Sequence, residues 1–222
     1  MVDVIHVHED DWGMRNLYPL AARAEAERDI AEAAAASERN RDPSGLGWTA
    51  MYMSQPPSAD YADVGLTLAA ADAALAPILP RVKRFNATIF SAMRDSSGPR
   101  DPYGSYEEDS WCFGIGPHCY IKLDPKGDLV GNIWFDFSSD DPADEARLRQ
   151  AIKAIDALVP SIIADYFLDA TGAISAPGFL DGYFASMAQT RRAAEEAMRA
   201  YRAPPREPGM LRKLFAIFGN RR

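Results

Sequence analysis

Residues 111–137, WCFGIGPHCYIKLDPKGDLVGNIWFDF, contain the clearest β-hairpin pattern in the chain. Two runs rich in aromatic and branched apolar residues flank the sequence DPKGD at positions 124–128, whose proline and glycine favour a tight turn. Because side chains alternate along a strand, the odd-numbered positions from Leu129 to Phe137 share one face and the even-numbered positions share the other. The odd-numbered positions are the more apolar, so we expect them to face the core.

Further strands and helices are expected on both sides of this hairpin. Short runs of alternating or β-branched residues predict strands over residues 2–8, 48–54 and 85–90. Alanine-rich segments and apolar residues at helical spacing predict helices over residues 17–40, 67–79, 142–166 and 178–201, the third with a kink or a break at Pro160. The pair Asp141-Pro142 supplies an N-cap and a proline at the first helical position, which marks the start of this third helix.

These elements predict an α+β fold, in which an antiparallel sheet of about five strands ends in the hairpin and is followed by helices packed on it. We expect residues 1–201 to form a single domain. Residues 202–222 contain three prolines, six basic residues and one acid, and are expected to form a linker and a short amphipathic tail. Such a tail favours weak contact with an anionic membrane surface, and a flexible or folded-back tail is the alternative.

The distribution of charge argues against nucleic-acid binding. The chain has 24 basic and 32 acidic residues, and residues 1–201 hold 18 of the basic and 31 of the acidic ones, a formal charge of −13. Such a surplus repels phosphate backbones and attracts basic proteins at low salt. We therefore expect another protein as partner, with a basic one favoured, and no nucleic acid. Solubility alone is the alternative role of an acidic surface.

Several features predict a cytoplasmic protein. The chain has no apolar run of the roughly 18 residues that a transmembrane helix needs, and residues 1–11 carry four acids where a secretory signal would carry basic residues. Cys112 and Cys119 lack the spacing of a redox pair or a four-ligand zinc site, so we expect reduced, partly buried thiols. His118 precedes Cys119, but adjacent strand residues point to opposite faces, and only a bend at Gly116-Pro117 would bring His118 near Cys112.

Three histidines are the candidate metal ligands. His6 and His8 lie two apart in the first predicted strand, so they point to one face with Cα atoms about 6–7 Å apart, a spacing that one metal ion can bridge. This His-x-His pattern resembles the opening of metal-dependent amidohydrolases and of polymerase-and-histidinol-phosphatase-type phosphoesterases. The resemblance covers only this tripeptide and implies further histidine ligands downstream, for which the chain offers His118. Histidines at a surface or subunit contact are the alternative.

The polar residues 95–109 form a long predicted loop and a candidate contact surface. We expect the acidic and aromatic residues of this loop and of the hairpin to bind the partner: Glu107, Glu108, Asp109, Trp111, Asp136 and Asp140. Carboxylates in this pattern also suit acid–base chemistry, or they cap helices and solvated turns.

The sequence therefore predicts a non-enzymatic cytosolic protein-binding module with an acidic surface and no cofactor. Small acidic bacterial proteins that neutralise toxins, and adaptor proteins, have this general character, but the chain carries no motif of such a family. A metal-dependent hydrolase that uses the His6 and His8 pair is the alternative. The oligomeric state is left open.

Overall fold

A computed structural model describes residues 3–43, 48–50, 52–88 and 104–202 of the chain. The chain divides into two compact units, residues 1–183 and 184–222, which are considered separately. The first unit holds every strand that the structure describes, and the described part of the second unit is the C-terminal portion of helix α4 (Phe179–Arg202).

The larger sheet of the first unit has six strands in the order β5-β6-β7-β2-β8-β9, and each pair of neighbours is antiparallel. The hairpin predicted from the sequence contributes β6 and β7, and Gly127 in its turn takes a φ of 67°, a conformation that glycine adopts without strain. The strands are β2 (Arg15–Pro19), β5 (Cys112–Gly116), β6 (Cys119–Lys126), β7 (Leu129–Phe137), β8 (Ser161–Asp165) and β9 (Ala170–Ala173).

A smaller sheet contains β1 (Val4–His8), β3 (Arg84–Thr88) and β4 (Ser105–Glu108). The central strand β3 pairs in parallel with β1 and antiparallel with β4. Alternate residues of β1 are buried, among them Ile5 and Val7, as expected for a strand with one face on the core.

Two of the helices begin at side-chain caps that the sequence supplies. The Thr67 hydroxyl accepts a hydrogen bond from the amide of Ala70, and the Asp141 carboxylate accepts one from the amide of Ala143. These caps start α2 (Leu68–Leu75) and α3 (Pro142–Leu158). Helix α1 (Arg23–Arg39) instead continues from a short 3-10 turn over Leu20–Ala22, and a second such turn, Glu9–Asp11, follows β1.

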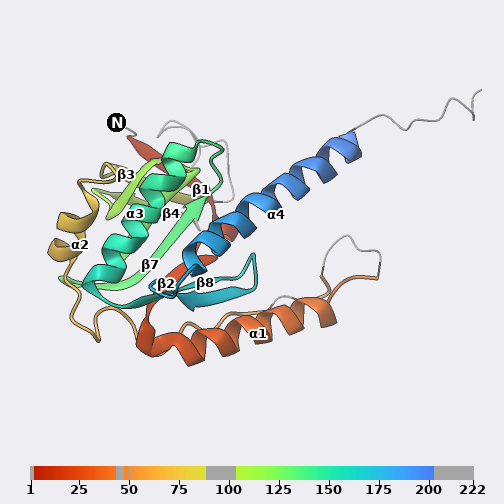
Figure 1. Cartoon of the computed structure of the whole chain (residues 1–222), viewed down its shortest axis with the longest axis horizontal. Helices are drawn as coiled ribbons and strands as arrows, with labels where there is room; N and C mark the ends of the chain where they lie inside the picture. The colour runs from red at the N-terminus through yellow and green to blue at the C-terminus, as the bar shows by residue number, and fades with distance from the viewer. Residues whose placement is uncertain (1–2, 44–47, 51, 89–103, 203–222) are drawn as a thin grey trace, which may run out of the picture. The chain divides into compact units, whose positions relative to one another are not determined.

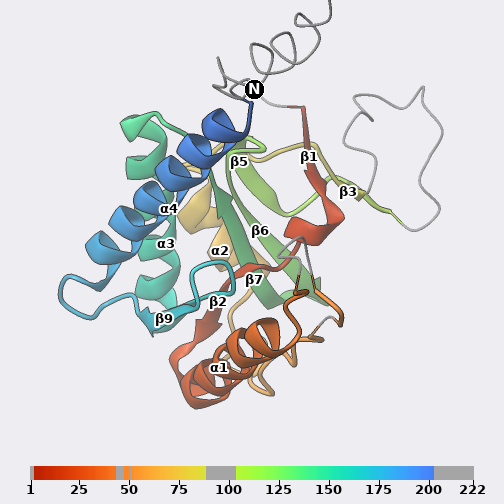
Figure 2. The ribbon, with the colours of Figure 1, turned by 90° about the vertical axis from the view of Figure 1, so that its right-hand side faces the viewer.

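The two faces of the six-stranded sheet are covered in different ways. Helix α3 packs on one face through Leu148, Ile152 and Ile155, which are fully buried. The opposite face is covered in two pieces, by the small sheet over Tyr120 and Trp134 and by α1 over β8 and β9. Figure 2 shows α3 on one side of β6 and β7 and strands β1 and β3 on the other, and Figure 1 shows α1 alongside β8.

The α+β class is confirmed, but the prediction of one sheet with about five strands is wrong. The described residues form nine strands in two sheets. Four of them, β2, β4, β8 and β9, form where the sequence predicted no strand, and β4 lies within the predicted polar loop 95–109. Strand β2 lies at the start of the predicted helix 17–40, and β8 lies in the part of the predicted helix 142–166 that follows Pro160. A short apolar run such as SIIAD does not distinguish a buried strand from a helix by its periodicity, and Pro160 ends α3 instead of kinking it.

Residues 111–123, predicted as one extended run, form two strands. The chain turns back at Pro117-His118, so β5 and β6 pair with each other instead of continuing in line. In the predicted strand 48–54, the described residues form no strand, and Trp48 makes a single bridge with Arg41. Residues 89–103 of the predicted third strand and polar loop, and residues 203–222 of the predicted tail, lie outside the described part of the chain.

Candidate functional site

A hollow of about 790 Å³ opens on the sheet face that carries two separate covers. Its floor is formed by side chains of β2, β6 and β7 that point to this face: Asn16, Tyr18, Asp124, Asn132 and Trp134. Its walls come from the β1–β2 connection, from α1, from Trp48 and the segment 52–56, and from the β8–β9 turn. Because seven of its lining residues are aromatic, we call it the aromatic hollow. A hollow of this size is within the range of ligand-binding pockets.

One end of the aromatic hollow is built on Trp134. The Trp12 ring stacks on the Trp134 ring with centroids 5.7 Å apart, and Phe85 and Tyr120 meet Trp134 edge-on. The indole nitrogen of Trp134 also donates a hydrogen bond to Asp124 Oδ1 at 3.4 Å. Trp134 is buried, whereas Trp12 is 37% exposed and offers an aromatic surface to the hollow. These contacts hold the exposed indole in a fixed position.

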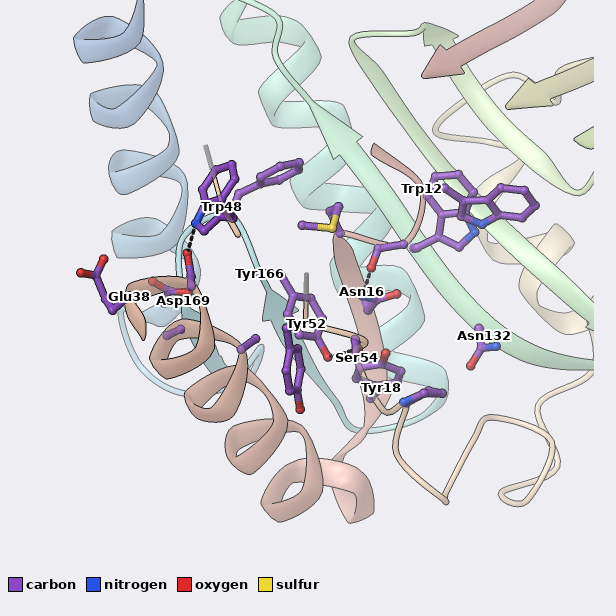
Figure 3. A pocket seen from close by; sticks show the side chains of 18 of the residues that line it. Trp12, Asn16, Tyr18, Glu38, Trp48, Tyr52, Ser54, Asn132, Tyr166 and Asp169 are labelled. Carbon is purple, nitrogen blue, oxygen red and sulfur yellow. Dashed lines mark hydrogen bonds between the residues drawn. The ribbon is translucent and has the colours of Figure 1, made fainter. Parts of the chain in front are cut away.

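The other end is formed by Trp48, Glu38 and Asp169. Trp48 is 63% exposed, and its indole nitrogen donates a 2.9 Å hydrogen bond to the hydroxyl of Ser37 on α1. Glu38 follows Ser37 on the helix, and Asp169 lies in the β8–β9 turn with a φ of 49°. Figure 3 shows these side chains at one end of the hollow and Trp12 at the other. This end therefore combines an exposed indole ring with two carboxylates.

Asp29 on α1 fixes the wall that carries Tyr52 and Ser54. Its buried carboxylate accepts hydrogen bonds from the Tyr52 hydroxyl (2.7 Å), the Ser54 hydroxyl (2.9 Å), the Gln55 amide (3.0 Å) and the Tyr166 hydroxyl. Burial raises the pKa of Asp29, but these hydrogen bonds outweigh it and leave the pKa below its ordinary value. The ionised Asp29 thus ties the segment 52–55 and the end of β8 to α1.

The tyrosine hydroxyls whose pKa Asp29 influences stay protonated at neutral pH. The hydrogen bond to Asp29 raises the pKa of Tyr52 to about 12, and burial together with the same carboxylate raises that of Tyr18 to about 12. For Tyr166, burial is the larger cause and the hydrogen bond to Asp29 adds to it. The Tyr52 and Tyr166 hydroxyls are donors that hold a wall in place, and the raised pKa values of all three tyrosines do not suit a general base.

The turn that carries Phe167 is held by a second polar cluster. The Asp165 carboxylate accepts hydrogen bonds from the amides of Phe167 (2.8 Å) and Leu168 (3.1 Å), from Arg15 Nε (3.2 Å) and from the Tyr183 hydroxyl (2.7 Å). The Arg15 guanidinium also lies over the Phe167 ring, 4.7 Å from its centroid. Phe167 is thereby fixed at the hollow while 45% of its surface stays exposed.

A buried cation lies beside the floor of the hollow, on the same face of the sheet. Lys122 is fully buried, and its Nζ atom contacts Glu107 at 2.8 Å, Asp124 at 3.2 Å and the carbonyl oxygen of Leu123 at 3.0 Å. The same ammonium lies 5.6 Å from the centre of the Phe85 ring. Because Asp124 also accepts the Trp134 indole hydrogen bond, Lys122 connects the small sheet to the floor of the hollow.

The acidic residues predicted to bind a partner lie outside the lining of the aromatic hollow. Glu107 pairs with Lys122, and Asp136 is half-buried and pairs with Arg15. Burial raises the pKa of Asp136, and the Arg15 guanidinium opposes that shift. The others lie near the surface. Glu108 ends β4 and Asp109 follows it, and both are exposed; Asp140 is exposed before α3. The Arg81 guanidinium lies over the Trp111 ring, 3.9 Å from its centroid. Their role in binding stays a prediction.

The histidines and cysteines do not form a recognisable reaction centre in the described residues. His6 and His8 are half-buried on β1, where His6 Nε2 lies 3.3 Å from the Thr88 hydroxyl. His118 is exposed in the β5–β6 turn, and its Nδ1 lies 3.2 Å from the Ser138 hydroxyl. The described part of the chain contains no group of three His, Cys, Asp or Glu side chains that could hold a metal ion. The metal site at His6, His8 and His118 therefore stays a prediction without a cluster to support it.

The two thiols are unpaired and buried. Burial raises the pKa of Cys112 well above its ordinary value and raises that of Cys119 to about 12. The bend at Pro117-His118 does exist, but His118 is exposed while Cys112 is fully buried. Thiols in this state are poor nucleophiles, so the geometry gives no support to cysteine catalysis.

Sequence reasoning missed the residues of the aromatic hollow, since they come from segments far apart in the chain. One signal in the sequence indicates that Trp12 and Trp48 are not core residues. Each lies next to a glycine in a turn-rich segment, where a tryptophan is less suited to a core than it is in a strand. Comparisons with protein-family models, with curated proteins and with solved structures found no significant match to this chain. Among the described helices, none combines the length and the hydropathy that crossing a bilayer requires.

Proposed function

We propose that this chain is a non-enzymatic protein-binding module whose aromatic hollow is the recognition site. The observation that carries the proposal is that three aromatic side chains, Trp12, Trp48 and Phe167, line the hollow while remaining 37%, 63% and 45% exposed. Tryptophan is enriched among the residues that contribute most to protein–protein affinity, because it buries a large rigid surface at low entropic cost. Each of these rings is held by a hydrogen bond or a ring contact, which reduces the ordering cost on binding.

The charge of the hollow favours a basic partner. Its lining contains the carboxylates of Glu38, Asp124 and Asp169 and one guanidinium, that of Arg41. The excess of acids agrees with the charge of −13 on residues 1–201. Electrostatic complementarity of this kind increases the rate of association and selects among partners more than it increases affinity.

The class of partner follows from the same features. A cytoplasmic setting, supported by two cysteines that are unpaired and buried, suits a protein that binds another soluble protein as an adaptor or neutralises a toxic one. In both cases the module acts by occupying a surface of its partner. Such a function requires a rigid complementary surface and no acid–base pair.

A capture experiment with matched variants tests the proposal. The wild-type chain, the double variant Trp12→Ala/Trp48→Ala and the control Trp111→Ala are immobilised and exposed to lysate of the native host. We expect a protein that the wild type and the control retain and the double variant loses. We also expect less of it as NaCl rises from about 50 mM to about 500 mM, because screening shortens the range of charge attraction.

Two results would contradict the proposal. Retention of the same proteins by wild type and double variant would exclude the hollow as the binding surface. Loss of the partner in Trp111→Ala alone would move the site to the surface around Glu107, Glu108, Asp109 and Trp111. Circular dichroism of each variant checks that the fold persists.

A further inference from the structure

We infer that the Trp48 end of the aromatic hollow is a subsite for an arginine side chain of the partner. This inference rests on the proposed function, since it names the chemical group that a binding partner would place in the hollow. Three features of the described residues support it: the orientation of the Trp48 ring, the carboxylates beside it and the neutralisation of the other cations near the hollow.

The Trp48 ring is positioned to present its face. Its one hydrogen-bond donor, the indole nitrogen, is occupied by the Ser37 hydroxyl at 2.9 Å, so the ring is attached to α1 by its edge. With 63% of the residue exposed, the attached ring still offers aromatic surface to solvent. Tryptophan is the aromatic side chain that attracts cations best, through the negative potential of its ring face. Attachment by the edge therefore leaves available the part of the ring that binds a cation.

Two carboxylates flank this ring. Glu38 is adjacent to Ser37 on α1, and Asp169 lies on the facing β8–β9 turn. Glu38 pairs with Arg41, whereas the Asp169 carboxylate has no hydrogen-bond or ion-pair partner among the residues that the structure describes. An incoming cation can thus pair with Asp169 while its flat face lies on the indole. This end of the hollow has one carboxylate more than it has cations.

The other cations near the hollow are already engaged. Arg15 pairs with Asp136 and Asp165, and Lys122 pairs with Glu107 and Asp124. Neither is available to neutralise Asp169. The remaining cation of the lining, Arg41, is held by Glu38. Removing Arg41 would therefore release a second carboxylate for the incoming cation.

Guanidinium fits this arrangement better than ammonium. It is planar, so it stacks on a ring while its edge donates two parallel hydrogen bonds to a carboxylate. The same chain makes this kind of contact within its own fold, with Arg81 over Trp111 at 3.9 Å and Arg15 over Phe167 at 4.7 Å. A lysine ammonium is a compact charge that makes a single contact with a carboxylate and is more strongly hydrated.

Short synthetic peptides test the subsite directly. Three peptides of sequence Gly-Ser-Gly-X-Gly-Ser-Gly carry arginine, lysine or citrulline at X; citrulline has the shape of arginine without its charge. Binding is measured by chemical shifts of the tryptophan indole N–H groups in the full chain, at peptide concentrations up to about 5 mM, which covers the weak affinity expected of a single side chain. We expect the arginine peptide to bind at least threefold more tightly than the lysine peptide and at least tenfold more tightly than the citrulline peptide.

Variants of the chain locate the site. Trp48→Ala and Asp169→Asn should each weaken binding of the arginine peptide at least fivefold, whereas Trp111→Ala should leave it unchanged. Asparagine suits position 169 because it tolerates the positive φ there and removes only the charge. Arg41→Gln should strengthen binding about two- to threefold, because it frees Glu38, in line with the value of an exposed charge pair. If Arg41 only stabilised the fold, Arg41→Gln would not strengthen binding of the arginine peptide.

Equal binding of the arginine and citrulline peptides, no binding at the highest concentration, or unchanged binding in Trp48→Ala would each overturn the inference. These outcomes are separable from failure of the proposed function. If Trp12→Ala/Trp48→Ala loses a captured protein but the arginine peptide does not bind, the hollow is a protein-binding site that recognises another group. If the peptide binds and no protein is captured, the subsite exists and the protein-binding proposal fails.

Discussion

The two faces of the six-stranded sheet differ in the side chains that they present and in the elements that cover them. On the face under α3, the strands present Ile121, Leu123, Ile133 and Phe135, which are almost entirely buried apolar side chains. On the other face, the same strands present Tyr120, Lys122, Asp124, Asn132 and Trp134. The first face is covered by the apolar side of α3 and, at Phe135, by Tyr183 near the start of α4, whereas the second is divided between the small sheet and α1.

This difference explains why the hollow lies on the second face. An apolar face covered by a complementary helix leaves no room and no polar group to direct a partner. A face with mixed aromatic and charged side chains has to pair its buried ions, as Lys122 does with Glu107 and Asp124, and the gap between its two covers remains open as the aromatic hollow. We therefore expect mutations on the α3 face to change stability alone, and those around the hollow to separate stability from binding.

The largest effect is expected from Phe135→Ala on the α3 face. Phe135 is 1% exposed and meets the Tyr183 ring edge-on with centroids 6.3 Å apart. Its truncation leaves a cavity and should lower the free energy of unfolding by about 3–5 kcal/mol. Urea denaturation measures this loss. If the variant lost the arginine peptide while still folded, the two faces would not be independent.

On the opposite face, Lys122→Ala is expected to lower the free energy of unfolding by about 2–3 kcal/mol. This loss is somewhat smaller than for a fully buried ion pair, because Glu107 and Asp124 are each about 30% exposed and partly solvated. Lys122→Met should cost less than Lys122→Ala, since it keeps the volume of the side chain. The matched control is Lys126→Ala, whose ammonium is solvent-exposed in its pair with Asp60, so that its loss of unfolding free energy should be much smaller. Equal losses of unfolding free energy in Lys122→Ala and Lys126→Ala would show that burial does not increase the contribution of the Lys122 ion pairs.

Asp29→Asn tests the polar wall of the hollow. It should lower the free energy of unfolding by about 2 kcal/mol at pH 7, because it weakens hydrogen bonds to an ionised acceptor. The pKa of Asp29 lies below its ordinary value of 3.8 in the folded chain, so its ionisation stabilises the fold above that pH. This contribution is lost as the pH falls through the folded pKa. The difference between wild type and variant, measured by denaturation from pH 7 to pH 2, should therefore shrink below about pH 4.

The exposed residue Asp181 provides the control for this pH dependence. Asp181→Asn removes a carboxylate that is 85% exposed, so its difference from wild type should be small at every pH. An Asp29→Asn difference that stays constant down to pH 2 would mean that Asp29 is not ionised in the folded chain.

Trp48→Ala should have the smallest effect on stability, within about 0.5 kcal/mol, because the residue is largely exposed and loses one hydrogen bond to Ser37. It should nevertheless weaken binding of the arginine peptide more than Phe135→Ala, Lys122→Ala or Asp29→Asn does. Thermal unfolding and peptide titration of the same preparation compare the two quantities. A loss of stability above about 2 kcal/mol would identify Trp48 as a structural residue.

The sequence predicted the parts of the fold that local signals specify. The turn at residues 124–128 with the second arm of the hairpin, the capped start of α3 and the strand around Phe85 were found, because alternation, turn residues and an N-cap act over a few positions. The first arm of the hairpin, residues 111–123, was predicted as one strand and forms two. Strands β2 and β8 were not found. Each lies in the interior of the sheet, where burial on both faces removes the alternation that identifies a strand.

For the candidate site, the sequence predicted an acidic body and a preference for a basic partner, since charge is a property of composition. It placed the binding residues on the segment 107–111 and the hairpin, whereas the hollow combines Trp12, Trp48 and Asp169. Those three residues are separated by 36 and 121 positions along the chain, and no local pattern relates them. Their relation depends on β2, which pairs with both β7 and β8 and whose residues 17–19 are predicted from the sequence to begin a helix.

The sequence by itself determined the α+β class, the central hairpin and the acidic character of the chain, because each follows from propensity, periodicity or charge along short stretches. Only the tertiary structure decided that one face of the sheet is covered by two separate elements with a gap between them. The physical reason is that Lys122, Asp124 and Trp134 cannot be sealed under a single apolar cover without losing their hydrogen bonds and ion pairs. The open hollow follows from the way in which these polar side chains are satisfied.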